Sequence, residues 1–247
     1  MAPKRKVQRG MHERHQGFQV FIGEYDDEGV YVYQAYCSEI ADYAVQHQCL
    51  GGPAFNPTRM TWIKPSFAWM LYRAGYALKD RQERILKIKI PHDALADLLS
   101  ACSCKHGGGG SKGRVQWDPA RDVMSSEGKG KSTEPRKLLR DRAIQIGLSQ
   151  DLSQKYVQSI MAIEDVTELA QQVGVAHHEK DVAAAMRNLE HLLPMERPYV
   201  PHCDDETLVG LQMAPRRQTF PPSTPGEPAL DSESEADDST AMCGDDL

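Results

Sequence analysis

The segment Arg59-Met-Thr-Trp-Ile-Lys-Pro-Ser-Phe67 gathers cations, hydroxyls and aromatic rings within nine residues. Pro65 suits the first turn of a helix, and the apolar spacing that follows predicts a helix over residues 66–74. A helix N-terminus presents unpaired backbone N–H groups and the positive end of the helix dipole, which suits a phosphate, a carboxylate or an oxyanion. Core packing accounts for about half of the aromatic side chains but not for Arg59 and Lys64, which are costly to bury without anions. We therefore expect the working site at this segment.

The elements predicted around this segment form a mixed α+β domain, with a single mixed sheet flanked by helices. Periodicity and β-branched or aromatic content distinguish the two kinds of element. Strands are expected at residues 18–22, 30–34, 84–90, 114–117 and 142–147. Further helices are expected at residues 38–48, 93–101, 152–162, 167–173 and 180–192. The first two strands flank the turn-forming sequence Tyr25-Asp-Asp-Glu-Gly29, so we expect them to pair as a hairpin.

Composition divides the chain into a folded part and polar ends. Residues 1–16 are expected to form a flexible basic arm, residues 17–214 a catalytic domain with a flexible insertion at 123–136, and residues 215–247 a disordered acidic tail. From residue 215 onward there are eight acidic and two basic residues, a net charge of −6. The whole chain also carries −6, so the remainder is formally neutral and a basic, nucleic-acid-binding face is not excluded.

The sequence favours a cytoplasmic protein. It contains no apolar run of roughly 18 residues that could span a bilayer, and its N-terminus lacks a secretory signal, so no membrane partner is expected. The six cysteines show no framework spacing and are expected to be free thiols. Cys102, Cys104 and His106 do not have the four-ligand spacing of a structural zinc site, so we expect no metal there.

Nucleotide and hydrolase signatures are missing from the sequence. There is no phosphate-binding loop ending in Gly-Lys-Ser/Thr, no Gly-x-Gly-x-x-Gly after a strand, no Gly-x-Ser-x-Gly and no His-Glu-x-x-His. An ATP-driven or NAD-dependent activity therefore has no direct support, and no cofactor is expected.

Two other regions supply candidate polar groups. The run Tyr31-Val-Tyr-Gln-Ala-Tyr36 either reflects β-propensity or places Tyr33, Gln34 or Tyr36 in a pocket where the strand ends. Asp118, Asp122 and Glu164 either bind a guanidinium through carboxylate pairing or serve as turn and cap residues. For Asp118, which precedes a proline, the turn role is the commoner one.

Several motifs in this chain resemble those of one family of bacterial and fungal proteins long labelled as a domain of unknown function. The resemblance runs from about residue 17 to about residue 201. It rests on Tyr25-Asp-Asp, Val32-Tyr-Gln-Ala-Tyr36, Glu39-Ile-Ala41, Arg59–Phe67, Trp69-Met70, Tyr72-Arg73, Val115-Gln-Trp-Asp-Pro119, Arg142-Ala-Ile-Gln-Ile-Gly147 and Glu164-Asp-Val166. The fungal members that the chain looks like include arginine-containing cyclodipeptide synthases. The insertion and the acidic tail fall outside the shared pattern.

The resemblance implies an enzyme that forms a cyclic dipeptide, a diketopiperazine, from arginyl-tRNA and a second aminoacyl-tRNA. An aminoacyl ester is already activated, so the chemistry needs no ATP; it needs an acyl acceptor, a base and cations for the RNA backbone. Ser66 is the candidate acyl acceptor, Lys64 would activate it or bind phosphate, and Tyr33 and Tyr36 are candidates for proton transfer.

The remaining candidates would bind substrate. For the aminoacyl substrate they are Arg59, Thr61, Trp62, Gln34, Asp118, Asp122 and Glu164. For the tRNA backbone they are Lys4, Arg5, Lys6 and Arg73, with Arg59. Two other functions stay open on the sequence alone: a group transferase on RNA or nucleotides, such as an ADP-ribosyltransferase-like enzyme, and a non-catalytic RNA-binding protein.

Overall fold

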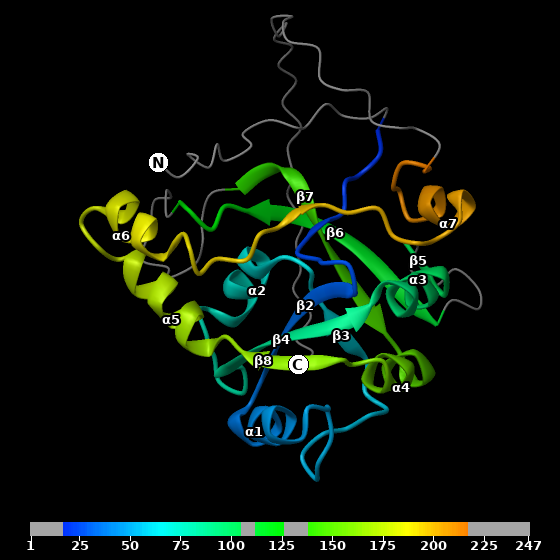
Figure 1. Ribbon diagram of the computed structural model, residues 1–247, viewed down its shortest axis with the longest axis horizontal. Coiled ribbons are helices and arrows are strands. Elements are labelled where there is room, and N and C mark those ends of the chain that lie inside the picture. Colours follow the sequence, from blue (N-terminus) through cyan, green and yellow to red (C-terminus); the bar gives the residue numbers. More distant parts are fainter. Residues whose placement is uncertain (1–16, 105–111, 126–137, 217–247) are drawn as a thin grey trace, which may run out of the picture.

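The computed structural model describes residues 17–104, 112–125 and 138–216, and it confirms the predicted α+β class. Within these residues it has seven helices and three sheets (Figure 1). The basic arm with Lys4, Arg5 and Lys6, the body of the insertion and nearly all of the acidic tail lie outside the described residues.

A three-stranded antiparallel sheet lies at the centre of the domain in the order β2-β4-β8. Its strands are β2 (Gly29–Tyr36), β4 (Arg84–Pro91) and β8 (Ala162–Asp165). Val32, Ile88 and Ile163 lie on one face, where they join the larger hydrophobic core. Helices α1 (Ser38–His47), α3 (His92–Ser100) and α4 (Gln150–Gln158) supply buried side chains to that core.

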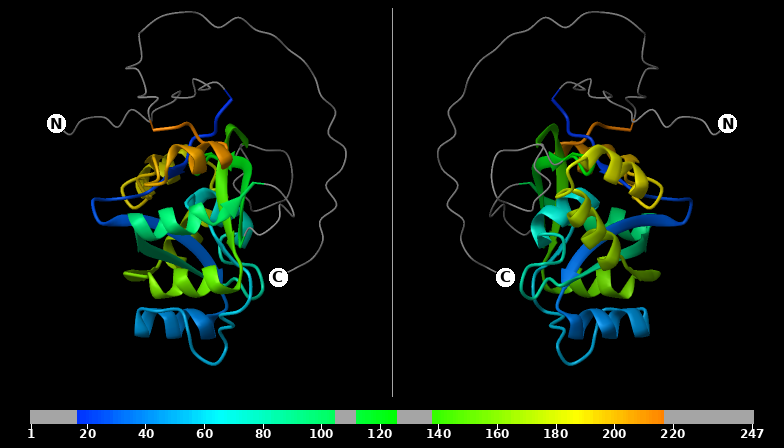
Figure 2. Two further views of the ribbon diagram at one scale, coloured as in Figure 1. Left: turned by 90° about the vertical axis from the view of Figure 1, so that its right-hand side faces the viewer. Right: turned by 90° about the vertical axis from the view of Figure 1, so that its left-hand side faces the viewer.

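A four-stranded sheet has the order β3-β7-β6-β5. Its strands are β3 (Thr61–Ile63), β7 (Leu138–Leu148), β6 (Gly113–Arg121) and β5 (Cys102–Ser103), of which β5 pairs in parallel and the others antiparallel. Seen from the side, β6 and β7 form one wall and β2 with β4 form the other (Figure 2). A short ribbon of β1 (Ile22–Gly23) and β9 (Arg197–Pro198) completes the β-structure.

The two larger sheets meet at a single isolated bridge between Tyr33 and Lys64. The Tyr33 N–H donates to the Lys64 carbonyl at 2.7 Å, and the Lys64 N–H donates to the Tyr33 carbonyl at 3.2 Å. Lys64, which directly follows β3, is therefore hydrogen-bonded to the middle of β2.

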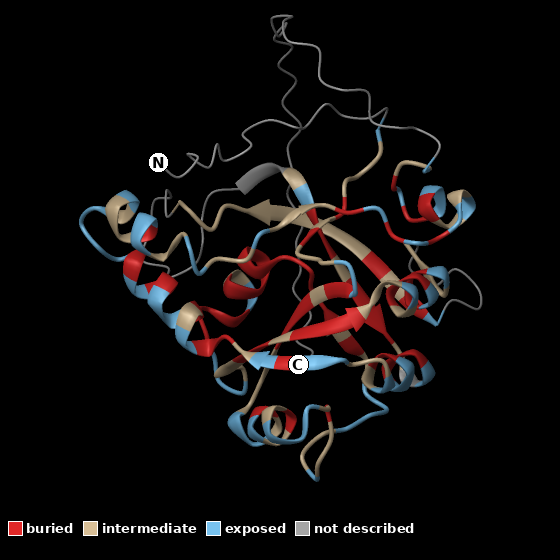
Figure 3. Ribbon diagram, viewed as in Figure 1, coloured by how far each residue is buried: buried red, intermediate tan, exposed pale blue. Residues whose placement is uncertain are grey.

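A second core packs on the other face of β2 and β4. Tyr33 and Ile85 contact apolar side chains of α2 (Phe67–Ala74), α5 (Thr167–Ala176) and α6 (Val182–Leu189). Burial concentrates on the central strands, on α2 and on the inner faces of the outer helices (Figure 3). The last helix, α7 (Asp205–Gly210), lies beside β9 and the end of the described chain.

Three details of the sequence prediction are wrong. The β-structure forms three sheets rather than one. The turn around Tyr25 and Val30 is present, but β2 pairs with β4, and β1 pairs with β9 near the other end of the domain. The helix expected to reach residue 162 ends at Gln158, because Ala162–Asp165 adds to the edge of β4 as strand β8.

Gly29 offers a test of the β2–β4 pairing. A Cβ atom at Gly29 would lie 2.2 Å from the backbone oxygen of Ile90, a contact that only a backbone shift relieves. We expect Gly29→Ala to lower the free energy of unfolding by about 2 kcal/mol or more, measured by urea denaturation. Gly210→Ala is the control, because no atom lies within 4 Å of its Cβ position. Equal stability of the two variants would contradict the register.

Candidate functional site

Three adjacent strands bring polar side chains of the recognised motifs together on one sheet face. Gln116 of β6 is in register with Gln145 of β7. The Gln145 side-chain amide donates to Gln116 Oε1 at 3.0 Å and to Asp118 Oδ2 at 2.6 Å. Trp62 of β3 lies beside β7 on the same face, and Lys64 follows two residues later. We call Trp62, Lys64, Gln116, Asp118 and Gln145 the polar face.

Gly147 gives Trp62 its place on this face. The two residues are in register, and a Cβ atom at position 147 would lie 2.8 Å from the Trp62 ring. The indole therefore lies directly against the β7 backbone. The Arg114 guanidinium lies 5.5 Å from the centroid of the ring, within the range of a cation–π interaction.

Lys64 is a buried cation, with only 8% of its surface exposed. Burial and the nearby charge of Arg73 lower the pKa of its ammonium group to about 8, and the charge of Asp118 opposes this shift. Burial in turn raises the pKa of the Asp118 carboxyl, against the Gln145 hydrogen bond and the charges of Arg73, Lys64 and Arg142. The polar face therefore holds an amine that loses its proton near pH 8.

One of the exposed cations predicted to bind substrate or RNA lies near this face. Arg73 projects from α2 and is exposed, and its charge reaches both Lys64 and Asp118. Arg59 is exposed just before β3 and acts electrostatically on Tyr36. The structure thus brings together Trp62, Lys64, Arg73 and Asp118 from the predicted set.

Other predicted residues hold β3 in place. Thr61 is buried and shares a 2.8 Å hydrogen bond with the hydroxyl of Ser153 on α4. The Gln34 amide donates to the Trp62 carbonyl at 3.2 Å and accepts from the Tyr156 hydroxyl at 2.8 Å. Tyr36, at the end of β2, is partly buried against Phe55, and burial raises the pKa of its hydroxyl.

Ser66 begins α2, as the sequence predicts, and acts as its N-cap. Its Oγ accepts from the Trp69 N–H at 3.4 Å, and 8% of the residue is exposed. The Phe67 N–H donates to Oε1 of Glu196 at 2.5 Å. The predicted anion site at this helix N-terminus is therefore occupied by a carboxylate of the chain itself.

Glu196 is a site residue that the sequence analysis missed. Burial, with a smaller effect from the charge of Glu24, raises the pKa of its carboxyl to about 7, although hydrogen bonds from Phe67 and Ser66 oppose the rise. Glu196 lies 129 residues from Phe67 in the sequence, so no local sequence pattern indicates this contact. The only hint in the sequence was an acidic residue inside the proline-rich stretch after residue 193.

The side chain of Tyr33 contacts Glu24. Its hydroxyl donates to Glu24 Oε2 at 3.0 Å, and Lys87 pairs with the same carboxylate at 2.9 Å. Burial and the charges of Glu24 and Glu196 raise the pKa of the Tyr33 hydroxyl. A second group consists of Ser66, Glu196, Glu24 and Tyr33, and we call it the carboxylate cluster. Glu24 and Glu196 supply the charges that act within this cluster, whereas the charges that act on Lys64 are those of Arg73 and Asp118.

The remaining predicted carboxylates lie elsewhere. Asp122 follows β6 and accepts from the Met124 N–H at 2.9 Å, which is the turn role considered as its alternative. Glu164 is exposed on β8, in register with Lys87, and its charge reaches Tyr33. Neither joins the polar face.

Comparison with known families agrees with the extent of the resemblance. A family described as a domain of unknown function (DUF4291) matches residues 20–199. The chain belongs to the DUF4291 family. Its DUF4291 region contains the polar face, Ser66 and Glu196, whereas α7 lies beyond it. No curated protein matched the chain. In the part that the structure describes, no helix is both long enough and apolar enough to cross a membrane.

Glu196 makes stability depend on pH in a predictable direction. Its pKa in the folded state, about 7, exceeds the ordinary value of 4.5, so the folded state holds the proton more tightly. This contribution to stability is present below pH 4.5 and is lost as the pH rises to 7. We expect Glu196→Gln to remove that loss, so that the variant gains up to about 3 kcal/mol relative to the native chain between pH 5 and pH 8.

Urea denaturation at pH 5, 6.5 and 8 measures this difference. Glu179→Gln, at an exposed position, is the control and should follow the native pH profile. Parallel profiles for Glu196→Gln and the native chain would show that Glu196 keeps an ordinary pKa in the folded state.

Proposed function

We propose that this DUF4291 protein is a tRNA-dependent cyclodipeptide synthase that forms an arginine-containing cyclic dipeptide from arginyl-tRNA and a second aminoacyl-tRNA. The observation that carries the proposal is Lys64, a buried amine whose pKa is lowered to about 8, beside Asp118 on a face built from the shared motifs. The motif resemblance indicates the reaction, and the polar face contains a base, Lys64, and a carboxylate, Asp118, that this reaction could use.

Lys64 would act as the general base of aminolysis. The α-amino group of one aminoacyl-tRNA attacks the ester carbonyl of the other, so that a C–N bond forms and the ester C–O bond breaks. Neutral Lys64 accepts the proton that the attacking amine loses, and the released ribose hydroxyl takes up a proton. The free amine of the dipeptidyl-tRNA then attacks its own ester, which closes the six-membered ring and releases the second tRNA.

The surroundings of Lys64 suit an RNA-borne ester. Trp62 offers an aromatic surface, and the exposed Arg73 offers a cation to phosphate groups near the polar face. In the substrate complex the Asp118 carboxylate would contact the arginine guanidinium or the ammonium group of Lys64, since both are cations that a half-buried carboxylate stabilises.

A covalent route would run through Ser66. Its hydroxyl would attack the arginyl ester, the Glu196 carboxylate would take the hydroxyl proton, and the ester bond to ribose would break as a seryl ester forms. The contact between Ser66 and Glu196 and the pKa of Glu196 near 7 support this form of the proposal.

The test combines product analysis with a Lys64 variant. The purified protein, incubated with tRNA charged with labelled arginine and with a mixture of other aminoacyl-tRNAs, should release a labelled diketopiperazine detectable by mass spectrometry. Lys64→Met should lower the rate at least about 100-fold, because it removes the base. For the native protein the rate should rise with pH up to about 8 and then level off, as Lys64 loses its proton.

Lys155→Met, at an exposed position on α4, is the matched control and should keep the native rate. A folded native protein that makes no cyclic dipeptide would refute the proposal. Salt-dependent tRNA binding without turnover would support a non-catalytic RNA-binding protein instead, and transfer of label from NAD to RNA would support the ADP-ribosyltransferase-like alternative.

Ser66→Ala separates the two routes. If a seryl ester forms, the variant loses the product, and the native protein incubated with arginyl-tRNA alone gains the mass of one arginyl group. If the reaction is direct aminolysis, the variant keeps most of its activity and no acylated protein is found. Asp181→Ala controls for loss of an N-cap, which costs about 1 kcal/mol, because Asp181 caps α6 by accepting from the Ala184 N–H.

A further inference from the structure

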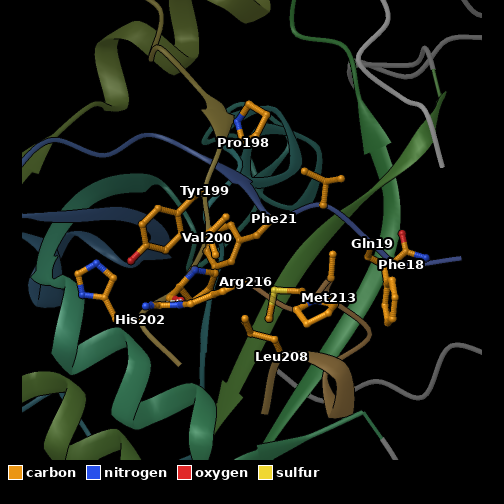
Figure 4. A pocket seen from close by; sticks show the side chains of 14 residues that line it. Phe18, Gln19, Phe21, Pro198, Tyr199, Val200, His202, Leu208, Met213 and Arg216 are labelled. Carbon is orange, nitrogen blue, oxygen red and sulfur yellow. Dashed lines mark hydrogen bonds between the residues drawn. The ribbon is translucent and has the colours of Figure 1, made fainter. Parts of the chain in front are cut away.

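A cavity of about 550 Å³ lies between the β1–β9 ribbon and α7. Its volume is within the range of small-molecule sites, about 300–1,000 Å³. It is separate from the polar face, and it is lined mainly by apolar side chains that converge from three stretches of the chain (Figure 4). The lining residues are 18–21, 198–202, and Leu208 with residues 213–216.

Backbone hydrogen bonds hold the walls of the cavity in position. The Tyr199 N–H donates to the Phe21 carbonyl at 2.8 Å, and the Gln19 N–H donates to the Gln212 carbonyl at 2.7 Å. Phe21 and Tyr199 pack edge to face, with ring centroids 5.3 Å apart. Leu208 and Met213 are buried and close the floor. The hollow is therefore preformed, which limits the entropy lost on binding.

Polar groups gather at one side of the cavity. In Figure 4 the Arg216 guanidinium lies beside the His202 ring, on the side away from Phe18 and Gln19. The guanidinium donates to the Pro201 carbonyl at 2.6 and 3.2 Å. Those bonds use two of its five N–H donors and fix its position, so the cation stands at the edge of an apolar hollow.

From this arrangement we infer that the cavity binds a small molecule with an aromatic or other apolar body and one carboxylate group. The apolar body would fill the space between Phe21, Leu208 and Met213, where aromatic edges favour an aromatic ring. The carboxylate would pair with Arg216, whose planar fork suits two carboxylate oxygens. The DUF4291 match covers residues 20–199, so ten of the fourteen lining residues lie outside the family region.

Binding of 4-phenylbutyrate and of the neutral 4-phenyl-1-butanol, measured by isothermal titration calorimetry on the full chain, tests the inference. The native protein should bind the acid saturably at one site, and at least tenfold more tightly than the alcohol. Arg216→Gln should weaken binding of the acid about tenfold and leave binding of the alcohol nearly unchanged, since only the acid pairs with the guanidinium.

A space-filling variant tests the location. Val200→Trp should abolish binding of both compounds, because Val200 lines the cavity. Val209→Trp is the matched control: Val209 is similarly exposed, at 46% against 40% for Val200, but does not line the cavity. No saturable binding to the native protein, equal weakening of both compounds by Arg216→Gln, or binding that survives Val200→Trp would each overturn the inference.

Discussion

The two backbone hydrogen bonds between Tyr33 and Lys64 are the constraint on which both groups of functional side chains depend. They connect a three-stranded and a four-stranded sheet that share no other strand pairing within the described residues. Side chains alternate along β2, so the same strand directs Tyr33 toward Glu24 and Gln34 toward the backbone of Trp62. Lys64 is thereby fixed at the point where β3 ends and the chain turns into α2.

Two lysines with the same exposed fraction have different charged neighbours. Lys89 has the same exposed fraction as Lys64, 8%. Its ammonium group pairs with Asp26 and Glu28, and these carboxylates raise its pKa. Lys64 instead has Arg73 as a neighbour, so the charge of that residue adds to the effect of burial and the pKa falls. A lysine without a strong anionic partner at a strand end fits a group that exchanges protons better than one that stabilises the fold.

Sequence patterns within a few residues predicted the elements that depend on local interactions. The start of α2 at Ser66, the strands that carry Asp118 and Gln145, and the turn after Tyr25 all follow from spacing and turn chemistry within a few residues. Strand pairing across the domain could not be predicted in this way, because β1 is joined to β9 across more than 170 residues of sequence. Strand β8 was not predicted, and its first residue, Ala162, was placed at the end of a helix, since four residues are too few to show a period of two.

The same limitation applies to the anion at the start of α2. The sequence indicated that this helix N-terminus suits an anion, but not that Glu196 supplies it. Pro65 and Ser66 predict a helix N-terminus, and such an end attracts negative charge. That the charge belongs to Glu196 depends on the β1–β9 ribbon, which packs on the β3–α2 corner so closely that a Cβ atom at Gly23 would lie 3.3 Å from Pro65 Cβ. Glu196 immediately precedes this ribbon, and the cavity residues Pro198 and Tyr199 form and follow its second strand. The same ribbon therefore forms part of the cavity wall and places Glu196 beside Ser66.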